Sequence, residues 1–141
     1  MALLRVLFVC IGNTCRSPMA EAIARALGGD ELEASSAGLM PVGRIVPATC
    51  HTLETLGYDP RGLASKGLGD VDPEGFDVVV SLLGEPGLSH LASFHGARRE
   101  AWSIPDPYGE DDEVYLAVAR ELERRIRHLL EEHARGELAI G

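Results

Sequence analysis

The sequence has few basic residues, few cysteines and no long apolar run. Its 141 residues include 13 Lys and Arg against 22 Asp and Glu, which gives a formal net charge of −9. This acidic balance argues against broad binding to nucleic acid or to an anionic membrane, because both need a basic face. No apolar stretch approaches the roughly 18 residues that a membrane span needs, so we expect neither a nucleic-acid nor a membrane partner.

Cysteine is scarce and odd in number, since only Cys10, Cys15 and Cys50 occur. An odd count argues against the disulfide framework of a small secreted protein. The start of the chain also lacks the basic and apolar regions of a signal peptide. We therefore expect a reduced, cytoplasmic protein that forms a single domain over residues 1–141. The five histidines lack the ligand spacing of a zinc site, so we expect no metal and no cofactor.

Strand-like and helix-like segments alternate along the chain. Residues 3–9 form the apolar run typical of a strand buried on both faces. An apolar period of four over residues 18–27 predicts a helix, with Ser17 as its N-cap and Gly28-Gly29 at its end. Further strands are predicted at 32–36, 76–83 and 100–104, and further helices at 47–57, 86–95 and 112–134. The alternation predicts an α/β fold with a parallel sheet and helices on both of its faces.

The loop between the first strand and the first helix carries the strongest chemical signal. Cys10 is followed six positions later by Arg16, and Ser17 comes next. A helix N-terminus attracts an anion, Gly12 and Asn13 let the loop wrap around it, and an arginine can clamp two oxyanions. The same surroundings favour the thiolate form of Cys10. The pattern predicts a cysteine nucleophile facing a tetrahedral oxyanion, and the alternative is a core cysteine beside a surface arginine.

Asp106 is the candidate general acid. A thiolate that attacks phosphorus expels a poor leaving group, so the reaction needs a proton donor elsewhere in the chain. Asp106 stands between Pro105 and Pro107, in a loop after a predicted strand and close to Tyr108. The alternative is a turn aspartate that makes only local hydrogen bonds.

Residues 6–21, VLFVCIGNTCRSPMAE, resemble the signature of the low-molecular-weight protein tyrosine phosphatases, a superfamily that includes thioredoxin-type arsenate reductases. Residues 35–38 and 106–109 resemble the second-strand block and the acid loop of that family. The resemblance implies a three-layer α/β domain with a four-stranded parallel sheet, and it implies no metal. It also implies a phosphate-binding loop that consists of Ile11, Gly12, Asn13, Thr14, Cys15, Arg16 and Ser17.

The resemblance further implies a role for each catalytic residue. Cys10 would form a phosphocysteine, Arg16 would hold the phosphate, and Asp106 would act first as an acid and then as a base. Tyr108 would line the pocket that receives phosphotyrosine. We expect a monomer that acts on a phosphorylated protein or on a small phosphomonoester.

Two loop positions leave alternatives open. In this family a cysteine at the place of Cys15 can form a reversible disulfide that shields the nucleophile, and the alternative is a small buried apolar residue. Thr14 stands where many tyrosine phosphatases of this family have Ile, and it resembles the bacterial protein-arginine phosphatases. Phosphoarginine is therefore a second possible substrate, although neutral variation explains Thr14 equally well.

Arsenate reduction is the alternative function. Residues 78–83 and 99–102 resemble the arsenate reductase branch, whose enzymes relay a disulfide through two further cysteines near the end of that strand. Here Leu83 and residues 89–90 occupy that neighbourhood, and no cysteine follows Cys50. A three-cysteine relay of that form is excluded, whereas reductases that pass the disulfide to an external thiol need fewer cysteines. We expect Cys50 and Trp102 to pack in the core.

Overall fold

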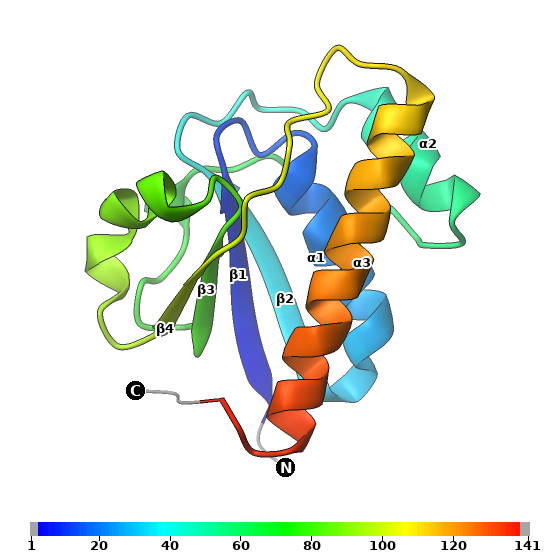
Figure 1. Cartoon of the computed structure of the whole chain (residues 1–141). Coiled ribbons are helices and arrows are strands. Elements are labelled where there is room, and N and C mark those ends of the chain that lie inside the picture. The colour runs from blue at the N-terminus through cyan, green and yellow to red at the C-terminus, as the bar shows by residue number, and fades with distance from the viewer. Residues whose placement is uncertain (1–2, 139–141) are drawn as a thin grey trace.

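The computed structural model describes residues 3–138. Four strands form one parallel sheet in the order β2-β1-β3-β4, which confirms the predicted α/β fold (Figure 1). The strands are β1 (Leu4–Cys10), β2 (Leu32–Gly38), β3 (Val78–Ser81) and β4 (Arg98–Ala101). The helices are α1 (Arg16–Gly28), α2 (Pro47–Thr55) and α3 (Asp112–Ala134), with 3-10 helices η1 (Gly29–Glu31), η2 (Leu68–Asp70) and η3 (Glu85–Phe94). Within residues 3–138, no helix is long and apolar enough to cross a membrane.

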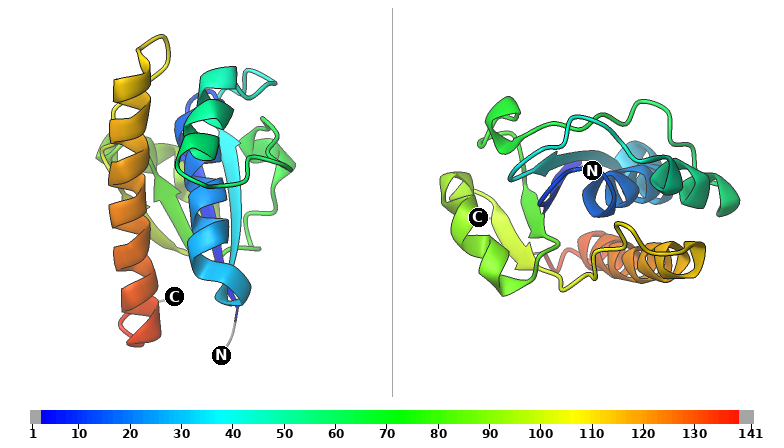
Figure 2. Two further views of the ribbon diagram at one scale, coloured as in Figure 1. Left: turned by 90° about the vertical axis from the view of Figure 1, so that its right-hand side faces the viewer. Right: turned by 90° about the horizontal axis from the view of Figure 1, so that it is seen from above.

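The central strand β1 is buried on both faces, as its apolar sequence predicts. Val6 and Phe8 face the larger core beneath α1 and α3, whereas Leu7 and Val9 face a smaller core beneath η3. The two long helices α1 and α3 lie side by side on the same side of the sheet (Figure 2). This arrangement leaves the carboxyl end of β1, where Cys10 stands, next to the start of α1.

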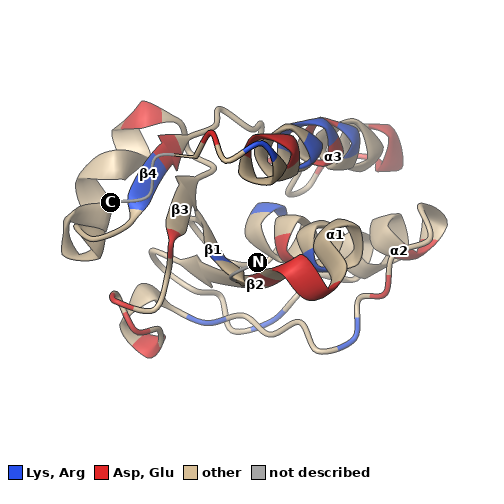
Figure 3. Ribbon diagram, turned by 90° about the horizontal axis from the view of Figure 1, so that it is seen from below, with Lys and Arg blue, Asp and Glu red and all other residues tan. Residues whose placement is uncertain are grey.

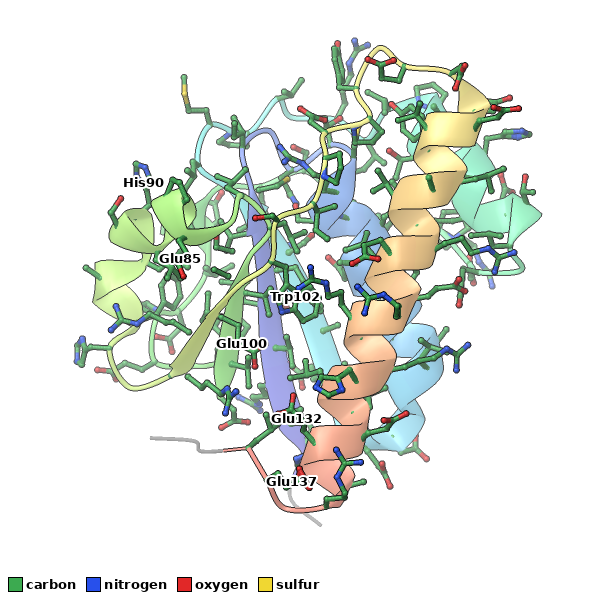
Figure 4. The ribbon with its side chains drawn as sticks, in the orientation of Figure 1. Glu85, His90, Glu100, Trp102, Glu132 and Glu137 are labelled. Atoms are coloured by element: carbon green, nitrogen blue, oxygen red, sulfur yellow. The ribbon has the colours of Figure 1, made fainter. Side chains whose placement is uncertain are left out.

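Trp102 belongs to the larger core, as expected. Its ring lies between the sheet and α3 (Figure 4), with its centroid 5.9 Å from that of Phe8. Its indole Nε1 donates a hydrogen bond to Glu100 at 3.0 Å, so the one polar atom of the ring is satisfied.

The last strand differs from the prediction, because β4 spans Arg98–Ala101 and not residues 100–104. Its neighbour β3 ends at Ser81, opposite Ala101, and beyond this point the parallel ladder gives way to a single antiparallel bridge between Leu83 and Ser103. The predicted helix over 86–95 is the 3-10 helix η3, kinked at Leu91. A proline and a glycine near its start disfavour a regular α-helix.

The start of α1 also differs from the prediction. The helix begins at Arg16, with Cys15 at the N-cap position and no side-chain cap. Ser17 lies inside the first turn and cannot cap it, because its hydroxyl is hydrogen-bonded to Cys10 and Asn13. Gly29, with a φ of 53°, ends the helix where the Gly-Gly pair predicts it. Ser17 therefore stabilises the loop through its hydrogen bonds and does not cap the helix.

Candidate active site

The loop from Cys10 to Ser17 joins β1 to α1 at the point where the chain changes direction across the sheet. From β1 the chain passes to β2 on one side and later to β3 on the other. The carboxyl end of a strand at such a switch point is the usual ligand site of an open α/β sheet. Cys10 lies here with 2% of its surface exposed, and Arg16 begins the helix above it.

The backbone of this loop is oriented by the segment that follows β2. The carbonyl groups of Cys10, Ile11 and Gly12 accept hydrogen bonds from the amides of Leu39, Met40 and Val42, at 2.8–3.0 Å. These contacts turn the carbonyls outward. Within the described part of the chain, the amides of residues 11–15 donate to no protein acceptor. Unpaired amides at a helix N-terminus form a cradle for an anion.

A chain of buried hydrogen bonds runs from the cysteine into the protein. The sulfur of Cys10 and the hydroxyl of Ser17 are 2.8 Å apart. The amide nitrogen of Asn13 donates to the hydroxyls of Ser17 and Ser36, at 2.8 and 3.0 Å. The Ser36 hydroxyl in turn donates to the carboxylate of Glu21 at 2.6 Å.

The direction of this chain matters for the chemistry. Since the Ser17 hydroxyl oxygen accepts from Asn13, its proton is free to be donated to Cys10. A hydroxyl proton aimed at sulfur stabilises a thiolate. Asn13 has a φ of 50°, and its side-chain oxygen accepts from the amide of Lys66 at 2.7 Å, which fixes the orientation of its amide group.

The side chain of Arg16 is oriented by contacts with the segment that follows β4. Its side chain is 8% exposed, and its Nη1 donates to the carbonyl of Ile104 at 3.0 Å. Its Nη2 lies 3.6 Å from the carboxylate of Asp106, which is half-exposed. Asp106 also accepts from the amide of Tyr108 at 3.0 Å, so the same residue makes the local turn contact and faces the site.

The loop and the segment after β4 enclose a pocket. Its volume is about 190 Å³, and it is lined by Cys10, Ile11, Gly12, Thr14, Cys15, Arg16, Val42, Asp106 and Tyr108. We call this hollow the catalytic pocket. Asn13 and Ser17 do not line it, because their side chains lie behind the loop in the hydrogen-bond chain. A neighbouring cavity of about 610 Å³ shares Ile11, Arg16 and Asp106 with it.

The mouth of the catalytic pocket is apolar. Ile11, Val42 and Tyr108 are 48%, 54% and 56% exposed, and Met40 next to them is 74% exposed. These residues account for four of the five large apolar side chains that are exposed in the described part of the chain. An exposed apolar patch on a soluble protein marks a binding surface.

Cys15 and Thr14 occupy the inner wall of the pocket. The thiol of Cys15 lies 3.4 Å from the hydroxyl of Tyr115, and burial raises the pKa of this thiol. Cys10 and Cys15 are both free thiols. The hydroxyl of Thr14 donates to the carbonyl of Arg44 at 2.6 Å, so this hydroxyl has no proton left to donate to a ligand.

Sequence reasoning missed the partners that hold the loop. Ser36 and Glu21 are buried and belong to the hydrogen-bond chain, and the Ile104 carbonyl orients Arg16. Gly38 is a further case, because a Cβ atom there would lie 2.6 Å from the carbonyl oxygen of Ile11. The signal for Ser36 and Gly38 was present in the 35–38 block, but only the fold brings that block beside the loop. Cys50 is half-buried on α2 and does not line the pocket.

No group of three or more His, Cys, Asp or Glu residues suited to a metal ion occurs within residues 3–138. The polar groups of the pocket are a thiol, unpaired amides, a guanidinium and a carboxylate.

A cysteine at the end of a central parallel strand, an arginine six residues later at a helix N-terminus and a carboxylate above them define a thiol enzyme with an oxyanion-binding loop. A family model described as low molecular weight phosphotyrosine protein phosphatase matches residues 5–138. The chain therefore belongs to this family.

Relatives with two named activities resemble the chain over most of its length. The glutaredoxin arsenate reductase of Synechocystis sp. is 32% identical over 131 residues, which cover 89% of this chain and 95% of that protein. The crystal structure of a low molecular weight protein tyrosine phosphatase from T. tengcongensis is 32% identical, with a TM-score of 0.81 and coverage of 92% of this chain and 99% of that one. An arsenate reductase in the phosphate binding state is 29% identical, with a TM-score of 0.81 and coverage of 92% and 98%.

Proposed function

We propose that the protein is a metal-independent phosphatase that hydrolyses aryl phosphates, in particular phosphotyrosine, through a phosphocysteine. The observation that carries this proposal is that one pocket gathers Cys10, Arg16 and Asp106. A phosphate-binding module needs the arginine and the amide cradle only. A nucleophilic thiol with a carboxylate above it is what phosphoryl transfer to the protein requires.

The first step transfers the phosphoryl group to sulfur. The amides of residues 11–15 and Arg16 hold the oxygens of the phosphate, and the thiolate of Cys10 attacks phosphorus. The bond from phosphorus to the aryl oxygen breaks, and protonated Asp106 gives its proton to that oxygen. Fixed donors around a transferring phosphoryl group supply most of the rate enhancement, because they need no reorganisation during the reaction.

The second step releases phosphate. Asp106, now a carboxylate, takes a proton from a water molecule, which attacks phosphorus and breaks its bond to the sulfur of Cys10. The thiolate leaves, and the proton donated by the Ser17 hydroxyl stabilises it. Asp106 is half-exposed at the mouth of the catalytic pocket, so water has access to it.

The rim of the catalytic pocket favours an aromatic leaving group. Ile11, Val42 and Tyr108 present apolar surface on which a phenyl ring would pack. Phosphoarginine would instead bring a guanidinium group to the same place. The Thr14 proton is engaged with Arg44, whereas its oxygen lone pairs remain able to accept from the N–H groups of such a guanidinium. The apolar rim is therefore our reason for placing phosphotyrosine ahead of phosphoarginine.

Hydrolysis of p-nitrophenyl phosphate in the presence of a chelator tests the proposal. The wild-type protein should turn over, and Cys10→Ser should be inactive. Cys50→Ser, which removes a half-buried thiol outside the pocket, is the matched control and should remain active. Turnover that persists in Cys10→Ser would overturn the mechanism. A comparison of phosphotyrosyl and phosphoarginyl peptides, in wild type and Thr14→Ile, then ranks the two substrates.

Arsenate reduction with an external thiol is the second candidate, and the arsenate reductases among the relatives favour it. In this reaction Cys10 forms a sulfur–arsenic(V) adduct. A small external thiolate then attacks the sulfur of Cys10, and the electron pair of the sulfur–arsenic bond passes to arsenic, which leaves as arsenite. The remaining mixed disulfide is reduced by a second thiol. No cysteine follows Cys50, which excludes the three-cysteine relay, and this candidate therefore uses an external thiol.

One measurement separates the two candidates. Release of arsenite from arsenate is followed with and without a small thiol such as glutathione, at the same protein concentration as the phosphatase assay. The phosphatase proposal predicts that turnover of aryl phosphate exceeds arsenite release. Thiol-dependent arsenite release that exceeds phosphatase turnover would make reduction the function.

A further inference from the structure

A second groove lies beside the catalytic pocket. Its volume is about 600 Å³, and its lining residues come from the segment after β4 and from the start of α3. Ser103 and Pro105 line this groove and also line the 610 Å³ cavity that contains Arg16 and Asp106. A substrate seated on the catalytic residues therefore needs to cross only this short segment to reach the second groove.

The groove combines an apolar floor with carboxylates. Pro105, Val114, Ala117 and Val118 supply apolar surface. Its carboxylates are those of Asp111, Glu113 and Glu121. We call the groove lined by these apolar and acidic residues the acidic groove.

The three carboxylates are not equivalent. Asp111 caps α3 by accepting from the amide of Val114, and Glu121 is paired with Arg124 and Arg125. Charges of both signs follow one another along α3 in this way (Figure 3). Glu113 makes no ion pair within the described residues and is exposed. It is therefore the carboxylate that an incoming cation would meet.

We propose that the acidic groove binds the side chain of an arginine or lysine that lies close to the phosphorylated residue of a protein substrate. This inference rests on the phosphatase function proposed above and narrows its substrate class. The aliphatic stem of such a side chain would pack on the apolar floor, and its charged end would reach Glu113. Long basic side chains commonly bind in this way, because the aliphatic stem packs on apolar surface while the charged group stays at the edge.

The charge of the whole chain supports the same partner. A phosphate group approaches a protein with a net charge of −9, and residues 110–113, four consecutive acidic residues, lie beside the groove. A basic residue next to the phosphate lowers the repulsion and steers the substrate toward the site. The same carboxylates repel a polyanion, so the groove does not fit a nucleic acid.

The test compares phosphotyrosyl peptides in which one flanking alanine at a time is replaced by Arg, norleucine or Glu. At one or more positions, Arg should raise kcat/KM by about threefold to fivefold over Ala, as for a partly exposed ion pair. Norleucine, which keeps the stem without the charge, should give a smaller gain, and Glu should lower the rate.

Three variants locate the effect. Glu113→Gln removes the unpaired carboxylate, and Ala117→Leu fills the floor without changing charge; both should abolish the preference for Arg. Asp112→Asn removes the same charge one residue away, at a position that does not line the groove, and should keep the preference. All three should hydrolyse p-nitrophenyl phosphate like the wild type, which also shows that they fold.

The outcomes separate this inference from the proposed function. If the wild type does not hydrolyse p-nitrophenyl phosphate, the proposed function fails and the groove has no substrate to select. If it does, but Arg at every position gives the same kcat/KM as Ala, only the present inference fails. Equal loss of the preference in Asp112→Asn and Glu113→Gln would also overturn it, because the effect would then belong to general surface charge.

Discussion

The guanidinium of Arg16 lies 3.6 Å from the carboxylate of Asp106, although the two residues are far apart in the sequence. The side chain of Arg16 is buried and that of Asp106 is half-exposed, so the carboxylate is the partner with more freedom to move. A bound phosphate would compete with this carboxylate for the guanidinium. Asp106 would then be released toward the leaving group, which is where an acid is needed.

Replacement of Asp106 by Asn should separate binding from turnover. We expect kcat for p-nitrophenyl phosphate to fall by about 10²–10⁴-fold, the usual contribution of a positioned acid or base. Inorganic phosphate should inhibit Asp106→Asn at least as well as the wild type, because a competing negative charge is gone. An unchanged kcat would show that Asp106 is a turn residue only.

The hydrogen-bond chain predicts a role for Ser36. In Ser36→Ala, Asn13 and Glu21 each lose a partner, so the Ser17 hydroxyl is held less firmly on Cys10. We expect kcat/KM to fall by about tenfold, because the buried hydrogen bonds of Ser36 with Asn13 and Glu21 are both lost. Ser35→Ala, a half-buried neighbour on β2, is the control and should keep the kcat/KM of the wild type. A Ser36→Ala variant as active as the wild type would contradict this role.

Cys15 predicts how the protein responds to oxidation. Cys10 and Cys15 are free thiols that line one pocket, and a disulfide between them would shield Cys10 from further oxidation. Hydrogen peroxide should therefore inactivate the wild type in a way that dithiothreitol reverses. Cys15→Ser should lose activity irreversibly, with a sulfinic or sulfonic acid at Cys10 detected by mass spectrometry. Equal recovery of both proteins would contradict the protective role.

Tyr58 links stability to alkaline pH. Burial, and then the hydrogen bond that its hydroxyl donates to Glu123, raise the pKa of Tyr58 to about 12, against about 10 for a free tyrosine. The folded state holds this proton more tightly than the unfolded state does. Its stabilising effect is therefore complete below about pH 10 and is lost as the pH rises toward 12.

Urea unfolding of Tyr58→Phe checks this linkage. The variant should lose about 1 kcal/mol of unfolding free energy at pH 7, the usual worth of one hydrogen bond. The difference from wild type should shrink between pH 10 and 12, in the interval bounded by the ordinary and the raised pKa. Tyr108→Phe, at an exposed tyrosine, should resemble the wild type throughout. A constant difference at every pH would contradict the assignment.

Part of this site was accessible to sequence reasoning, because its signal is local. The spacing of Cys10 and Arg16 depends on one loop and one helix N-terminus, and the apolar run before the loop identifies the strand that supports it. The helix over 112–134 was predicted with its observed bounds for the same reason, since its helical pattern is contained in the segment itself.

The rest depended on contacts that the sequence does not encode locally. Serine is a common N-cap residue, but the hydroxyl of Ser17 is hydrogen-bonded to Cys10 and Asn13 instead of capping the helix. Residues 102–104 resemble a strand in sequence, yet they make only isolated backbone contacts with residues 81–84, because the parallel ladder ends at Ser81. Ile104 orients Arg16 through a backbone carbonyl, which carries no side-chain signal.

The pairing of β1 with β2 places Phe8 opposite Ser36, and thereby sets Ser36 beneath the loop. Displacement of β2 by one residue would turn every side chain of the strand to the opposite face and remove Ser36 from Asn13. Correct alignment of the two strands and assembly of the catalytic loop are therefore a single event. A refolding experiment that follows enzymatic activity would report the register of the sheet, and a compact state with misaligned strands would be silent in that assay.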